Sequence, residues 1–140
     1  MSTPIRPARE GDIPRLVTIR AAVAENRLSD PGAVTAPHYL PYIARGSLWV
    51  WEEREALLGF AAVDFGASLL WALFVAPGAS GRGIGAALLA HAVAHARAAG
   101  LAELRLSTAP GTSAERLYRR TGWRETGRDA SGDLLMRLTL

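Results

Sequence analysis

The chain has 140 residues and a mass of 14.9 kDa, the size of one domain, and its 49% of apolar residues can fill a compact core. It contains no cysteine and its 16 basic residues are all arginine, which excludes disulfide frameworks, thiolate metal sites, cysteine nucleophiles, pyridoxal Schiff bases and lysine-containing phosphate loops. Residues 1–70 hold seven arginines and eight acids, whereas residues 71–140 hold nine arginines and five acids, so an anion is expected to bind to the second half.

The first half of the chain predicts short elements separated by proline and glycine. Asp12 is a residue type that caps helix N-termini, and Pro14 suits the turn that follows it. The expected elements are a strand over residues 3–7, a helix from Asp12 to about Ala24, a turn at Asp30-Pro31-Gly32, a short helix that begins at Thr35, is disturbed by Pro41 and ends at Gly46, and a hairpin of strands 47–52 and 56–64.

The second half alternates strands and helices. Residues 69–75 are continuously apolar, as in a buried strand, and the capping box formed by Thr112 and Glu115 marks the start of a helix. The expected elements are that strand, a glycine-rich loop, an alanine-rich helix over about 84–99 followed by Gly100, a strand over 102–108, a helix from Thr112 to Gly122, and a hairpin of strands 123–129 and 133–139.

This order of elements predicts one domain over residues 1–140, with an α/β fold of the mixed α+β kind. Strand 69–75, the helix after it and strand 102–108 form a crossover connection, which joins parallel strands. The hairpins on either side supply antiparallel strands. We therefore expect a central mixed β-sheet of about seven strands with helices on both faces.

The loop after residues 69–75 is suited to bind phosphate. Its glycines allow sharp turns and close approach of a ligand, and the helix N-terminus directs unpaired N–H groups at that ligand. The spacing of Gly81, Gly83 and Ala86 also fits a dinucleotide-binding pattern. Glu103, the acid that would then bind a ribose, stands at the start of the next strand rather than at its end, which argues against a dinucleotide. A tight turn without a ligand is the remaining alternative.

Two motifs together give the chain a family resemblance. The loop, beginning at Val75, has the form V-x-P-x-x-x-G-x-G-x-G, and the segment beginning at Ala114 has the form A-x-x-L-Y-x-x-x-G-W. With these motifs at this spacing, the chain resembles the GNAT superfamily of N-acetyltransferases over nearly its whole length. It departs from the family at Ser80, where Gln or Arg is common, and at Gly111, where many members have Asn.

The resemblance implies that acetyl-CoA is the cofactor and CoA the product, which agrees with the positive second half of the chain. The pantetheine arm would pair with the backbone of Phe74 and Val75. Arginine side chains would meet the phosphates, although a solvated surface position is the commoner state of arginine. The pyrophosphate would bind to the amides of Arg82, Gly83, Ile84, Gly85 and Ala86, and the arginines concerned are Arg82, Arg116, Arg119 and Arg120.

The resemblance also implies an acyltransferase that moves the acetyl group to a primary amine by direct attack in a ternary complex. Because the chain has no cysteine, a cysteinyl acetyl-enzyme cannot form. The Val75 N–H would donate to the carbonyl oxygen as it gains charge, and Tyr118 matches the family tyrosine that protonates the CoA sulfur. Tyr118 could instead be a core residue of a short helix. A CoA-binding sensor or scaffold without turnover is the alternative function.

Neither the general base nor the acceptor is identified by the sequence. The carboxylates near the loop are candidates only by position, and a chain of waters could replace them. The acceptor could be a small amine or a peptide or protein amine, because residues 25–46 carry no recognisable specificity code. The candidate carboxylates are Glu25, Asp64 and the cluster of Glu52, Glu53 and Glu55.

Histidines and tryptophans are interpreted as structural. His91 and His95 stand one helical turn apart, but zinc needs three or four ligands and no third is evident, so no metal site is predicted. Tryptophans in strands usually belong to the core, although Trp71 is also placed to line an acetyl pocket. The other tryptophans are Trp49, Trp51 and Trp123.

The sequence also predicts location and partners. No stretch reaches the roughly 18 consecutive apolar residues of a membrane span, and the N-terminal segment lacks the apolar region of a signal peptide. A soluble cytoplasmic protein without membrane contact is therefore expected. The pI of about 10.2 reflects the lack of Lys and Cys, so no nucleic-acid partner is predicted. The sequence leaves a homodimer open.

Overall fold

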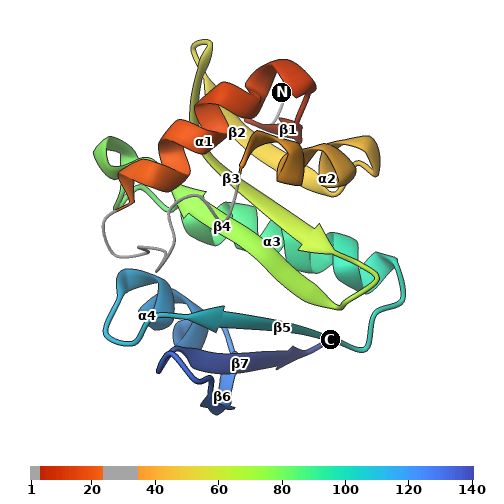
Figure 1. The fold of residues 1–140 in the computed structure, drawn as a ribbon, viewed down its shortest axis with the longest axis vertical. Coiled ribbons are helices and arrows are strands. Elements are labelled where there is room, and N and C mark those ends of the chain that lie inside the picture. The colour runs from red at the N-terminus through yellow and green to blue at the C-terminus, as the bar shows by residue number, and fades with distance from the viewer. Residues whose placement is uncertain (1–3, 24–34) are drawn as a thin grey trace.

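The computed structural model describes residues 4–23 and 35–140, which form one seven-stranded sheet with helices on both faces (Figure 1). The strand order is β1-β2-β3-β4-β5-β7-β6, and neighbouring strands are antiparallel except β4 and β5. The predicted mixed sheet is confirmed. The strands are β1 (Ile5–Pro7), β2 (Leu48–Glu53), β3 (Ala56–Asp64), β4 (Leu69–Val75), β5 (Glu103–Thr108), β6 (Arg124–Arg128) and β7 (Leu134–Thr139), and the helices are α1 (Ile13–Ala22), α2 (Leu40–Ala44), α3 (Ile84–Ala98) and α4 (Ser113–Arg120).

The hydrophobic core is divided between the two faces of the sheet. On one face, Leu16 and Ile19 of α1 are buried together with Phe60 of β3. On the other, the buried side of α3 packs with Tyr118 of α4 and with β5 and β7. In Figure 1, α1 and α2 lie in front of the strands and α3 lies behind them. A ligand at the end of the central strands can therefore contact elements from both layers.

Helix α3 packs closely on the sheet because its partner strand carries a glycine. A Cβ at Gly59 would lie 2.9 Å from the Phe74 carbonyl oxygen and 3.1 Å from a Leu88 methyl carbon, so no larger residue fits there without displacement. The helix ends at Ala98, and Gly100 follows its C-cap residue as expected, with a φ of +86°. No helix within the described part of the chain is long and apolar enough to cross a membrane.

The parallel strands β4 and β5 pair only where β4 begins. Leu69 is registered with Arg105, and the Arg105 amide donates to the Ser68 carbonyl at 2.8 Å. Beyond this point the described residues show no pairing between the two strands, while β5 remains paired with β7 from Glu103 to Thr108. The strands therefore diverge toward their carboxyl ends, as Figure 1 shows, and leave one backbone edge of β4 open.

The predicted helix caps are confirmed in part. Thr112 caps α4, since its hydroxyl oxygen accepts from the Glu115 amide at 3.2 Å. Asp12 occupies the N-cap position of α1 but its side chain does not cap that helix; it accepts instead from the Arg9 amide at 2.8 Å. The predicted turn at Asp30-Pro31-Gly32 lies outside the described residues.

Asp12 also takes part in an ion-pair cluster that ties three elements together. Arg6 of β1 donates to Asp12 at 2.9 Å and to Glu52 of β2 at 3.1 Å. Burial raises the pKa of Asp12, but hydrogen bonds from the Arg6 side chain and the Arg9 amide outweigh burial and hold the pKa below its ordinary value. A carboxyl whose pKa is lower in the folded state stabilises the fold above its unfolded pKa, and this stabilisation is lost as the pH falls through the folded value.

We therefore expect Arg6→Met to lower the free energy of unfolding by about 1 kcal/mol at pH 7, as for a charge-assisted hydrogen bond that is half-buried. At pH 3 the difference from the native chain should be smaller, because Asp12 is then partly protonated in both. Urea unfolding at the two pH values measures this, with Arg137→Met on the exposed face of β7 as the control. An equal loss at both pH values would contradict the assignment.

Candidate active site

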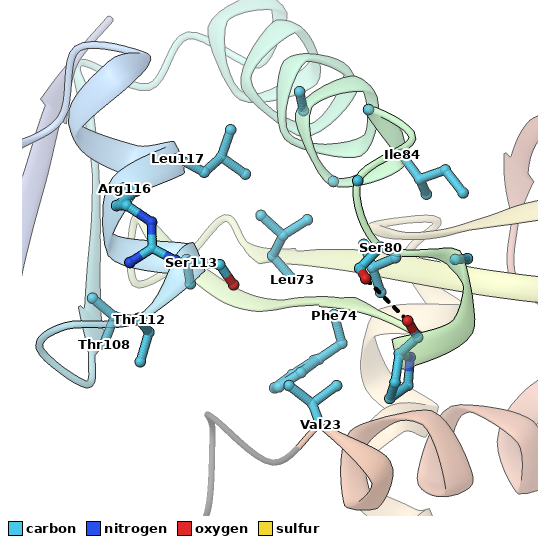
Figure 2. Close-up of a pocket in the computed structure, with 18 of the residues that line it drawn as sticks. Val23, Leu73, Phe74, Ser80, Ile84, Thr108, Thr112, Ser113, Arg116 and Leu117 are labelled. Carbon is cyan, nitrogen blue, oxygen red and sulfur yellow. Dashed lines mark hydrogen bonds between the residues drawn. The ribbon is translucent and has the colours of Figure 1, made fainter.

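A cavity of about 650 Å³ opens where β4 and β5 diverge (Figure 2). Its walls come from the end of α1, the end of β4, the glycine-rich loop, the first turn of α3 and the start of α4. Both sequence motifs therefore meet at one cavity. The lining residues are Ala22, Val23, Leu73, Phe74, Val75, Pro77, Ala79, Ser80, Gly81, Gly83, Ile84, Gly85, Ala86, Thr108, Thr112, Ser113, Ala114, Arg116, Leu117 and Arg120.

The glycine-rich loop presents an uncapped helix N-terminus to this cavity. Gly81 and Gly83 have φ angles of +80° and +81°, and a Cβ on either would meet no described atom within 4 Å. Gly83 is the N-cap of α3 without a side-chain cap, and the first helical hydrogen bond runs from the Ala87 amide to the Gly83 carbonyl at 3.0 Å. The preceding amides of the first turn are therefore free to donate to an anion.

The open edge of β4 exposes the backbone of alternate residues. Phe74 is registered with Phe60 of β3, and the Ala76 amide donates to the Leu58 carbonyl at 2.8 Å. Since strand residues alternate between the two edges, Phe74 also directs its backbone at β3, and the N–H of Val75 faces the open side. The expectation that the Phe74 backbone pairs with the cofactor is thus corrected: Phe74 contributes its side chain to the cavity.

The arginines expected at the phosphates separate into two pairs. Arg116 and Arg120 of α4 line the cavity. Arg82 instead pairs with Glu53 at 2.7 Å, and Arg119 pairs with Glu115 at 2.6 Å, so both of these side chains are engaged elsewhere on the surface. Of the four expected arginines, Arg116 and Arg120 are the two whose side chains line the described cavity and can add positive charge opposite the helix N-terminus.

The structure places Tyr118 beneath the cavity rather than among its lining residues. Its side chain is 5% exposed, and its ring centroid lies 5.5 Å from that of Trp123. Its neighbour Leu117 lines the cavity. Burial raises the pKa of Tyr118, so its hydroxyl stays protonated at neutral pH and is able to donate a proton but not to act as a base.

None of the candidate carboxylates belongs to the described lining of the cavity. Glu52 and Glu53 are paired with arginines, Glu55 lies in the β2–β3 turn, and Asp64 accepts from the Tyr42 hydroxyl at 3.3 Å. Glu25 lies outside the described residues. The structure therefore supplies no side-chain base from among the described candidates.

The two departures from the family motif have local explanations. Ser80 lines the cavity, and its hydroxyl donates to the Pro77 carbonyl at 3.0 Å, which holds the loop in its bend (Figure 2). Gly111 has a φ of +77°, and its amide donates to Glu115 at 2.7 Å. A left-handed conformation is one that glycine and asparagine both tolerate, so the backbone at Gly111 can be the same with either residue.

None of the described histidines and tryptophans belongs to the lining of the cavity. His91 and His95 have ring centroids 4.6 Å apart, and Trp49 packs against both rings. Within the described residues, no group of three metal-ligating side chains surrounds them. Trp71 stacks on Tyr42 at 4.4 Å on the α2 side of β4, so its indole is not part of the described cavity lining.

Sequence reasoning missed the last turn of α1, which forms one wall of the cavity through Ala22 and Val23. In the same turn, Arg20 extends its guanidinium over the Phe74 ring, with 4.6 Å between the guanidinium carbon and the ring centroid. A signal was present: Arg20 follows the buried Leu16 by four positions and therefore stands on the apolar stripe of the helix.

Comparison with known families and proteins gives a consistent result. The family model of the acetyltransferase (GNAT) domain matches residues 44–125. Peptidyl-lysine N-acetyltransferase YiaC of Escherichia coli is 52% identical over 48 residues, which make up 34% of this chain and 32% of that protein. The match to this curated relative thus spans only about a third of its length.

Solved structures resemble the chain over nearly its whole length. YncA of Salmonella typhimurium, solved with its cofactor acetyl-CoA, has a TM-score of 0.81 and 21% identity, and the alignment covers 100% of this chain and 95% of that one. Ribosomal-protein-alanine N-acetyltransferase of Brucella melitensis has a TM-score of 0.77 and 27% identity, with 97% and 99% covered. The sheet and helices described above are therefore shared with both proteins.

Proposed function

The chain belongs to the acetyltransferase (GNAT) domain family, and we propose that it moves the acetyl group of acetyl-CoA to a primary amine and releases CoA. One observation carries this proposal: the uncapped N-terminus of α3, the open edge of β4 and two arginines all border one cavity. The residues present fit a polyanion with an extended arm, because the helix amides and the arginines attract phosphates and the free strand edge can pair with amide groups.

When bound, acetyl-CoA supplies the activated acyl group. In this proposal the first-turn amides of α3, with Arg116 and Arg120, bind the phosphates. The Val75 N–H donates to the thioester oxygen as negative charge develops there, and the Tyr118 hydroxyl gives its proton to the departing sulfur. As the new carbon–nitrogen bond forms and the carbon–sulfur bond breaks, the amine proton passes to water, since no described carboxylate lines the cavity. The Tyr118 phenolate then takes a proton back from water, which completes the cycle.

The acceptor is proposed only as a primary amine, either of a small molecule or of a peptide or protein. The names of two relatives are examples of a protein acceptor. YiaC is named for peptidyl-lysine, and the Brucella protein is named for an alanine of a ribosomal protein. The cytoplasmic location, the lack of a nucleic-acid partner and the homodimer remain predictions.

A CoA-binding sensor or scaffold without turnover is the second candidate. Two observations favour it: no carboxylate belongs to the described cavity lining, and Tyr118 lies in the core. The sensor and the enzyme share cofactor binding, and release of free CoA in the presence of an amine separates them.

Isothermal titration with acetyl-CoA tests the shared part of both functions. We expect one binding site per chain and no heat of binding with NAD at the same concentration. Thiol release from acetyl-CoA is then followed with a panel of amines. Tighter binding of NAD than of acetyl-CoA would remove the acetyltransferase proposal, and acetyl-CoA binding without amine-dependent thiol release would favour the sensor.

A further inference from the structure

A half-buried arginine lies on the α1 side of β4. The guanidinium of Arg20 is sandwiched against aromatic rings, 4.6 Å from the Phe74 centroid and 5.5 Å from the Trp71 centroid. Such contacts are favourable for an arginine, but an aromatic ring accepts no in-plane hydrogen bond from the guanidinium N–H groups. The aromatic rings therefore pack against the Arg20 guanidinium, but its N–H groups still require hydrogen-bond acceptors.

Two nitrogens of Arg20 have no such acceptor. Nε and Nη1 are shielded from solvent and make no hydrogen bond with any described residue. The same holds for the hydroxyl of Tyr39, whose ring packs edge-on against Trp71 at 5.4 Å and against Phe60 at 6.0 Å. Burial raises the pKa of Tyr39, and the charge and the polar contact of the neighbouring Arg20 guanidinium oppose that rise. The donors of Arg20 and Tyr39 thus lie together in one aromatic cluster, without a well-placed acceptor among the described residues.

The described carboxylates on the α1 and α2 side of the sheet already have other hydrogen-bond partners. Asp12 and Glu52 pair with Arg6, and Asp64 accepts from Tyr42 and from the Ala67 amide. Leaving a shielded donor of a charged group unpaired is costly, and a carboxylate accepts a charge-assisted hydrogen bond from a guanidinium. The cluster of Arg20, Tyr39, Trp71 and Phe74 therefore offers donors that suit an anion.

The cluster adjoins the proposed reaction site from the side opposite to the proposed phosphate site. Phe74, which carries the guanidinium on its ring, lines the cavity together with Val23 of the same helix end as Arg20. Figure 2 shows Phe74 and Val23 on one side of β4 and Arg116 and Leu117 on the other. Phosphates held by α3 and α4 leave the α1 side of the cavity to the second substrate.

We propose that Arg20 and Tyr39 bind a carboxylate of the acceptor, so that the acceptor is a small amine that also carries a carboxylate, as an amino acid does. The inference rests on the proposed acetyl transfer and names the substrate class of the same site. One of the shielded nitrogens of Arg20 donates to a carboxylate oxygen, and the Tyr39 hydroxyl donates to the other oxygen. Phe74 and Trp71 fix the plane of the guanidinium and so the position of the bound carboxylate. The amine of the acceptor is then directed toward the open edge of β4.

The experiment compares each amine with a matched compound that lacks the charge. The probes are free L-amino acids, their α-carboxamides, and a lysine peptide with blocked ends, all assayed by thiol release with acetyl-CoA. For the native chain we expect at least one free amino acid to be acetylated with a KM at least about 10-fold below that of its carboxamide, the preference expected for a charge-assisted hydrogen bond. Equal rates for acids and carboxamides, or turnover of the lysine peptide alone, would overturn the inference.

Variants then test the residues. Arg20→Met keeps the stem and removes the charge, and it should abolish the preference for the acid while leaving the acetyl-CoA affinity unchanged. Arg20→Lys should restore part of the preference, and Tyr39→Phe should reduce it. The control is Arg97→Met, at an exposed position in the last turn of α3. A preference that survives in a folded Arg20→Met chain would overturn the assignment.

A second readout does not depend on turnover. The preferred amino acid at millimolar concentration should raise the Tm of the native chain and of Arg97→Met but not that of Arg20→Met; a rise in Arg20→Met as well would count against the site. If acetyl-CoA itself fails to bind in the titration, the proposed function has failed. If acetyl-CoA binds and amines turn over without preference for a carboxylate, only the present inference has failed.

Discussion

Replacing Gly83 with alanine is expected to weaken acetyl-CoA binding at least about tenfold, or ~1.4 kcal/mol. Gly83 is the N-cap of α3 at a φ of +81°, and a Cβ there would project into space that no described atom occupies within 4 Å. That space adjoins the first-turn amides, so the methyl group excludes a phosphate from them. The left-handed conformation also costs a residue with a Cβ about 1–2 kcal/mol of stability.

The two effects can be separated because α3 has a matched glycine at its other end. Gly100 has a φ of +86°, and a Cβ there would also meet no described atom within 4 Å. Gly100→Ala should therefore lose a similar free energy of unfolding and keep the native acetyl-CoA affinity. Isothermal titration and urea unfolding of the two variants give both quantities. Equal acetyl-CoA affinities in the two variants would show that the N-terminus of α3 is not the phosphate site.

The order and ends of the elements were predictable because they depend on local chemistry. Gly100 at the end of α3 and Thr112 at the start of α4 lie where a positive φ and a side-chain cap are required, and neighbouring residues suffice to recognise both. Asp12 shows where this reasoning stops. It has the residue type of a cap, but an arginine six positions earlier offers a stronger partner.

The site was predictable to the extent that backbone forms it. The glycine loop and the β4 edge need only a strand, a turn and a helix in sequence, which the motif specifies. Side-chain roles depend on partners distant in the chain. Arg82 meets Glu53, 29 positions away, and Arg20 meets Phe74 across the layer between helix and sheet, and no pattern within one segment contains either pair.

The direction of the Phe74 backbone shows a third feature that the sequence alone could not predict. It depends on which edge of β4 pairs with β3, and a shift of one residue exchanges the backbone groups of Phe74 and Val75. An irregularity in this pairing between Ala62 and Val63 of β3 makes the register harder to infer from alternation alone. Sequence reasoning can place a strand edge at the cavity but cannot choose between adjacent residues on it.

Replacement of Tyr118 by phenylalanine is expected to lower kcat by about 100-fold, within the range for loss of a general acid. The variant keeps the ring that packs against Trp123, so the acetyl-CoA affinity should change less than about twofold, a small step on the affinity scale. The hydroxyl of a buried tyrosine can also serve packing alone. Trp123→Phe addresses this, because it disturbs the same ring contact and leaves the hydroxyl in place. Its main effect should be a lower Tm with kcat largely retained.

The pH dependence gives the Tyr118 assignment an independent test. Burial raises the pKa of Tyr118 in the folded state, so its contribution to stability is complete below the unfolded value of about 10 and is lost as the pH rises toward the folded value. The native chain should therefore lose stability above pH ~10 more steeply than Tyr118→Phe. In the neutral range the hydroxyl stays protonated, and the ratio of native to variant kcat should be constant. If native chain and Tyr118→Phe have nearly equal kcat but still differ in stability above pH ~10, Tyr118 is a core residue. Protonation of the sulfur is then assigned to water.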